Sequence, residues 1–68
     1  MNLDFSNIGK RMQETRIQNK ITKKQMAEDL GISIKDISNL ENGKIDIELE
    51  KFITICDFLN ISIYDVLN

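Results

Sequence analysis

The middle of the chain carries two helix start signals, each followed closely by a helix stop signal. Thr22 stands three residues before Gln25, which is the spacing of a capping box. Gly31 then supplies the left-handed conformation that ends a helix. Ser33 follows two residues later as the N-cap of another helix, which ends at residues 42–43, an Asn-Gly pair. The sequence therefore predicts two short helices joined by a tight turn.

Hydrophobic residues in both segments fall at helical spacing, so each helix has one face directed to a core. Asp36 sits at the third helical position after Ser33 and is a weaker capping-box partner for it. Two short helices joined by such a turn form a helix-turn-helix, whose second helix projects from the body of the domain. The residues expected to face inward are Met26, Ala27, Leu30, Ile37, Leu40 and Glu41.

The segment before this motif also reads as a helix. Its cap is Asp4 or Ser6, and the sequence does not decide between them. Gly9 inside a helix costs about 1 kcal/mol relative to alanine, which indicates a close packing contact there. The inward stripe predicted for this helix is Phe5, Ile8, Met12 and Thr15.

Two further helices are predicted after the motif. One runs from Asp46 to Leu59, and Asn60 takes the left-handed stop usually given to glycine. Ser62 and Asp65 then cap a short fifth helix that ends at residues 66–67. The sequence thus predicts an all-α fold of five helices in a single domain over residues 1–68. The apolar stripe of the fourth helix is Leu49, Phe52, Ile53, Cys56 and Leu59.

Composition narrows the classes of function. The 68 residues include no histidine and one cysteine, Cys56, which removes most metal sites, the commonest general base and any internal disulfide. Neither an enzyme nor a cofactor is therefore expected. Cys56 falls in an apolar stripe and is expected to be a small core residue. No membrane span or secretion signal is visible, so a cytoplasmic protein is expected.

The charge is unevenly distributed. The net charge is −2, which counts against nucleic-acid binding when the chain is taken whole. Residues 45–68, however, have a net charge of −4, because they contain five acidic residues and one lysine. Residues 1–21 have a net charge of +2. The first two thirds of the chain therefore remain able to present a positive face.

The order of these residues resembles the lambda-repressor-like helix-turn-helix family, also described as Cro/repressor or xenobiotic-response-element type. The similarity extends from about residue 5 to residue 67, before and after the motif. It is carried chiefly by the combination Ala27, Gly31, Ile37, Leu40, Glu41, Asn42 and Gly43 at these spacings.

The resemblance implies a homodimer that lays its third helix in successive major grooves of double-stranded DNA. Lys35 has the chemistry to bind guanine, Asn39 to bind adenine and Ile34 to pack on a thymine methyl group. The residues that would contact bases are Ile34, Lys35, Ser38 and Asn39. Those that would contact phosphates are Lys10, Arg11, Thr22, Lys23 and Lys44.

The resemblance also implies an ion pair between Arg16 and Glu41 that holds the third helix against the first. The alternative is an exposed pair that contributes under about 1 kcal/mol. An apolar cluster near the C-terminus is either extra core or a dimer contact. It consists of Phe58, Ile61, Ile63 and Tyr64.

Some acids depart from the family's pattern. Asp36 would stand near the major groove of the bound DNA. Acids also follow the third helix at Asp46, Glu48 and Glu50. Each of these carboxylates would weaken binding to the DNA phosphates unless it points away from them. The first hypothesis is a transcriptional repressor that binds a palindromic operator, with regulation through a protein partner as one possibility. The second is a protein-interaction module that keeps the fold and binds a basic partner through its acidic C-terminal third.

Overall fold

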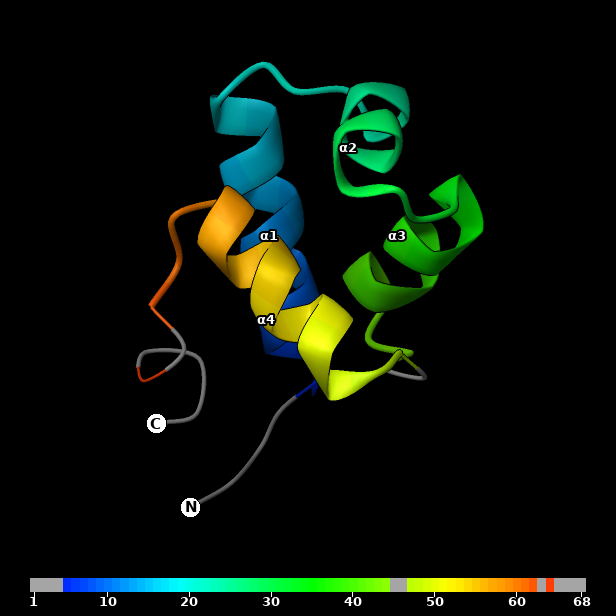
Figure 1. The fold of residues 1–68 in the computed structure, drawn as a ribbon. Coiled ribbons are helices and arrows are strands. Elements are labelled where there is room, and N and C mark those ends of the chain that lie inside the picture. The colour runs from blue at the N-terminus through cyan, green and yellow to red at the C-terminus, as the bar shows by residue number, and fades with distance from the viewer. Residues whose placement is uncertain (1–4, 45–46, 63, 65–68) are drawn as a thin grey trace.

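A computed structural model describes residues 5–44, 47–62 and 64 of the chain. The all-helical class predicted from the sequence is confirmed, because these ranges contain helices and no strand. Figure 1 shows α2 and α3 on one side of the molecule and α1 and α4 on the other. The helices are α1 (Phe5–Gln18), α2 (Lys23–Leu30), α3 (Ile34–Glu41) and α4 (Leu49–Phe58).

Four helices are thus described where five were predicted. The fifth, expected over residues 62–67, lies outside the described residues except for Ser62 and Tyr64. Buried hydrophobic side chains from all four helices form one cluster, and the side chains in it with the lowest exposure are Met12, Met26, Ile37, Leu40, Ile55 and Cys56.

The two predicted N-caps, the capping box of Thr22 with Gln25 and the glycine turn are confirmed. Thr22 accepts from the backbone N–H of Gln25 at 3.0 Å, and the side chain of Gln25 accepts from the backbone N–H of Thr22 at 3.0 Å. Gly31 ends α2 in the left-handed region with φ 66°. Ser33 then accepts from the backbone N–H of Asp36 and starts α3. Local side-chain chemistry therefore sets the length of both helices and the turn between them.

The buried face of α1 differs from the predicted stripe. Gly9 and Arg16 are buried, whereas Phe5 is 45% exposed and Thr15 is half-buried. The reason is the close approach of α1 to the end of α3, where a Cβ on Gly9 would lie 2.7 Å from the carbonyl oxygen of Glu41. Because glycine has no Cβ, the backbones of α1 and α3 can approach closely at Gly9, and the face of α1 that carries Gly9 therefore packs against α3. Ser6 lies inside α1 and is not its N-cap, and Asp4 lies outside the described residues.

The predicted bounds and stripe of α4 also need correction. The helix starts at Leu49, after Glu48, and Asp46 lies outside the described residues. Leu49 and Ile53 are 70% and 41% exposed, while Ile55, which was left out of the stripe, is fully buried. The buried stripe is Phe52, Ile55, Cys56 and Leu59, so α4 is rotated about its axis relative to the prediction.

Beyond α4, Asn60 has φ 59°, which confirms the left-handed stop predicted at this position. Lys20 has φ 58° in the turn between α1 and α2, and nothing in the sequence indicated it. Among the described residues, no helix is long and apolar enough to cross a membrane.

Candidate nucleic-acid interface

The outer side of α3 brings the four predicted base-contact residues together. Ile34 is 48% exposed and Lys35 is exposed, while Ser38 and Asn39 are half-buried. Positions one turn apart share a side of a helix, so the four side chains form one strip. The opposite side of α3 is held in the core by Ile37 and Leu40. The strip of polar and apolar side chains therefore lies on the exposed side of a helix whose other side is packed in the core.

Arg16 and Glu41 form a buried ion pair. Arg16 Nε donates to Glu41 Oε2 at 2.7 Å, and its second terminal nitrogen donates to Oε1 at 3.3 Å. Their side chains are only 8% and 3% exposed. A third bond, 2.8 Å from Arg16 to the backbone carbonyl of Ile21, occupies the other terminal nitrogen. The structure thus has the buried form of this pair, in which both oxygens of Glu41 are satisfied.

Lys23 and Ser38 contact each other across the helix-turn-helix. Lys23 Nζ, at the start of α2, donates to Ser38 Oγ on α3 at 3.1 Å. The same ammonium lies 4.0 Å from Glu41 Oε1. Lys23 was expected to contact a phosphate and Ser38 a base, but the structure joins the two side chains by a direct hydrogen bond. The two residues are fifteen positions apart on different helices, so no pattern in the sequence predicted this hydrogen bond.

The other predicted phosphate contacts lie on three segments. The hydroxyl of Thr22 is engaged with Gln25 in the cap, so its side chain already has a structural role. Lys10 and Arg11 are exposed on α1. Lys44 is exposed just after α3, where its backbone N–H donates to the carbonyl of Asn39 at 2.8 Å.

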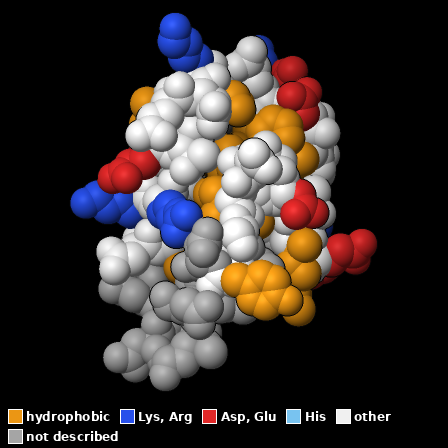
Figure 2. Space-filling model, turned by 90° about the vertical axis from the view of Figure 1, so that its left-hand side faces the viewer, with side chains coloured by type: hydrophobic (Ala, Val, Ile, Leu, Met, Phe, Trp, Pro, Cys, Tyr) orange, Lys and Arg blue, Asp and Glu red, His pale blue; other side chains and the backbone are white. Residues whose placement is uncertain are grey.

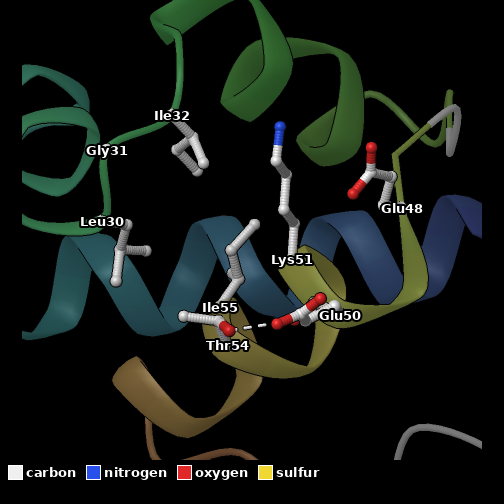
Figure 3. Close-up of a pocket in the computed structure, with 8 residues that line it drawn as sticks. All are labelled: Leu30, Gly31, Ile32, Glu48, Glu50, Lys51, Thr54 and Ile55. Atoms are coloured by element: carbon white, nitrogen blue, oxygen red, sulfur yellow. Dashed lines mark hydrogen bonds between the residues drawn. The ribbon is translucent and has the colours of Figure 1, made fainter.

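Acidic residues occupy a groove on the α4 side of the motif. The groove has a volume of about 240 Å³ and lies between the turn of the helix-turn-helix and the start of α4. Figure 3 shows Lys51 extending across it, with Glu48 on one side and Glu50 at the base of α4. Its apolar lining comes from Leu30, Ile32 and Ile55. Asp36 is half-buried in the first turn of α3, where its backbone N–H donates to Ser33 Oγ at 3.0 Å. Among the described residues its carboxylate makes no return bond to Ser33, so the predicted second half of this capping box is not seen.

The structure separates the residues predicted as a dimer contact. Ile61 is 7% exposed and belongs to the core, and Phe58 packs against that core. Tyr64 is 75% exposed, and Ile63 lies outside the described residues. Ile61 is therefore core and not an exposed contact, because the left-handed turn at Asn60 folds it back and its N–H donates to the carbonyl of Cys56 at 2.8 Å.

Cys56 is a core residue. It is 1% exposed, and burial together with the charge of Asp57 raises the pKa of its thiol. Over the described part of the chain, no group of three or more histidine, cysteine or acidic residues is placed to hold a metal ion.

Two short capped helices, a glycine turn and an anchored second helix with an exposed outer side define a helix-turn-helix domain. The chain belongs to the helix-turn-helix domain family, whose family model matches residues 9–68. Among solved structures, it is similar to the clp gene regulator ClgR from C. glutamicum, with 27% identity and a TM-score of 0.77. The match covers 98% of this chain and 87% of that chain. No curated protein matches the sequence. The resemblance drawn from the residues alone is confirmed.

Proposed function

We propose that this protein is a non-enzymatic transcription regulator that binds double-stranded DNA in a sequence-specific manner through α3. The proposal rests on the way α3 packs against the rest of the domain. Ile37, Leu40 and Glu41 hold one side of α3 in the core, so the opposite side, with the strip defined above, faces outward from a fixed helix. The similarity to a gene regulator supports the same function.

The strip has the chemistry for reading bases in the major groove. Lys35 binds the O6 and N7 acceptors of guanine, Asn39 pairs with adenine, and Ile34 packs on a thymine methyl group. Lys10, Arg11 and Lys44 contact phosphates, which sets the register without reading sequence. The acids Glu48 and Glu50 line the groove beside α4 and do not belong to the strip on α3.

The protein acts as a homodimer on a palindromic operator and represses transcription in the cytoplasm. Leu49 and Ile53 support a second copy as the partner, because these exposed side chains lie one turn apart on α4. Half-sites lie about 34–36 Å apart. The molecule measures 33 × 23 × 18 Å, so two copies side by side fit that spacing. Figure 2 shows exposed hydrophobic side chains gathered on the face that forms the left-hand side of Figure 1.

The test is selection from a randomised duplex DNA pool at low salt and again near physiological salt, followed by sequencing of the bound duplexes. A two-fold symmetric site with half-sites about one helical turn apart is expected. Only weak binding that is blind to sequence and vanishes with salt would overturn the proposal, since that is the behaviour of phosphate contacts alone.

A second candidate is a protein-interaction module, and the groove beside α4 favours it. Its apolar floor matches an apolar side chain of a partner segment, and the two carboxylates of Glu48 and Glu50 outnumber the one ammonium of Lys51, so the groove favours basic residues beside it. Reversing the charge at Glu48 and Glu50 separates the two candidates. Binding of a basic partner peptide is lost under the second function, whereas operator selection is unchanged under the first.

A further inference from the structure

The contact between Lys23 and Ser38 lies within the strip that would read bases. The ammonium of Lys23 is 3.1 Å from Ser38 Oγ and 4.0 Å from Glu41 Oε1. These two acceptors stand one turn apart on α3. Glu41 is itself held by the buried guanidinium of Arg16. The position of the ammonium is therefore set by the core, although the side chain of Lys23 is 36% exposed.

The chemistry of the two groups fixes the direction of their hydrogen bond. An ammonium has three donors and no acceptor, so Ser38 must accept and its hydroxyl hydrogen must point elsewhere. A hydroxyl that accepts from a cation becomes a stronger donor, because hydrogen bonds in a chain polarise one another. It also becomes a poorer acceptor for a second donor, which would approach the same positive charge. No other hydrogen bond of the Ser38 side chain is seen among the described residues.

We propose that Lys23 is a specificity-determining residue that makes Ser38 a hydrogen-bond donor to DNA. Ser38 then favours a base with a keto oxygen in the major groove, which is O6 of guanine or O4 of thymine. It disfavours cytosine, whose major-groove edge offers only an amino donor, and it disfavours adenine relative to guanine, because adenine has the N6 amino donor where guanine has the O6 acceptor. This inference rests on the proposed function, in which α3 enters the major groove.

The role differs from a phosphate contact by Lys23. A lysine on a phosphate raises affinity for every sequence alike and adds to the salt dependence. A lysine that orients Ser38 changes the preference at one base position and leaves the others unchanged. Base preference at single positions is therefore the measurement that separates the two roles.

The experiment is selection from the randomised duplex pool with the wild-type chain and with Ser38→Ala, Lys23→Met, Lys23→Arg and Lys24→Met. The position at which Ser38→Ala alters the preference identifies the base that Ser38 faces. There, the wild type is expected to favour guanine or thymine by about fivefold, as one net hydrogen bond provides. Lys23→Met abolishes this preference. Lys23→Arg retains it, because arginine is also a cation with donors only. Lys24→Met, which removes the same charge from the neighbouring position, retains it too.

The outcomes separate the inference from the proposed function. A wild-type chain that selects no sequence overturns both. A wild-type site whose preference survives Lys23→Met, or favours an amino base opposite Ser38, overturns the inference alone. Loss of preference at every position in Lys23→Met, with a lowered melting temperature, also overturns it, since the lysine would then act on the fold. Ser38→Ala without effect at any position means that the hydroxyl does not read DNA, which again overturns the inference.

Discussion

The guanidinium of Arg16 and the carboxylate of Glu41 are joined by two hydrogen bonds in a site between α1 and α3 that is almost inaccessible to solvent. The pair links the first helix to the last residue of the helix that carries the candidate reading strip. Among the described residues, no buried side-chain polar atom lacks a hydrogen-bond partner, so each charge in this site is compensated. The orientation of α3 therefore depends on an ion pair as well as on apolar packing.

Glu41→Gln is expected to lower the free energy of unfolding by about 3–5 kcal/mol, because it leaves the charge of Arg16 buried without its partner. Urea denaturation measures the loss. Glu14→Gln is the matched control, since it removes the same charge from an exposed position on α1 and should change stability little. A loss under about 1 kcal/mol for Glu41→Gln would mean that the pair behaves as an exposed one.

Gly9→Ala is expected to destabilise the protein although alanine favours a helix by about 1 kcal/mol. The new Cβ would meet the backbone carbonyls of Leu40 and Glu41, and separating two backbones costs about 1–3 kcal/mol or more. Thermal or urea unfolding provides the measurement. Gly31→Ala is the control, because its Cβ would meet nothing within 4 Å and its cost comes only from the left-handed backbone. A Gly9→Ala variant more stable than the wild type would contradict the close approach of α1 to α3.

Lys35→Ala is expected to weaken operator binding by about 1–3 kcal/mol and to relax specificity at one base position. The affinity for the selected operator and for single-base variants of it measures both effects. Lys24→Ala removes the same charge from an exposed position on α2 and should weaken all sequences alike. Equal behaviour of the two variants would show that α3 does not read bases.

If the proposed homodimer forms through Leu49 and Ile53, Leu49→Asp is expected to leave the chain monomeric, because it places a charge among the apolar side chains that a second copy would cover. Sedimentation equilibrium at several concentrations gives the mass. Ile17→Asp is the matched control, since Ile17 is 57% exposed and lies on α1, so the same charge is added to an exposed apolar side chain of a different helix. A wild-type chain that remains monomeric on operator DNA would rule out the homodimer.

The buried thiol of Cys56 makes stability fall at high pH. Burial first, and the charge of Asp57 second, raise the pKa of the native thiol above its ordinary value of 9.0. The unfolded chain therefore loses this proton first, so the contribution is complete below pH 9.0 and is lost as the pH rises through the native pKa. Urea denaturation from pH 8 to pH 10, compared with Cys56→Ala, measures it. A decline of equal size in both proteins would assign it to other groups.

The elements governed by neighbouring residues were predicted well. Thr22 with Gln25, Gly31, Ser33 and Asn60 each act on backbone groups within a few positions, so their roles follow from local chemistry. The rotation of α1 and α4 was predicted less well. Several apolar stripes are compatible with α4, and only its neighbours decide that Ile55 is buried while Ile53 remains exposed.

By itself, the sequence determined the helix-turn-helix, its caps, its turn and the strip of residues along α3. The tertiary structure decided the burial of Arg16 with Glu41, the return of Ile61 to the core and the bond from Lys23 to Ser38. The physical reason is range. A cap is satisfied by atoms one turn away, whereas burial and long side-chain contacts depend on how closely separate helices approach. In this chain that approach is governed by Gly9, where the backbones of α1 and α3 meet.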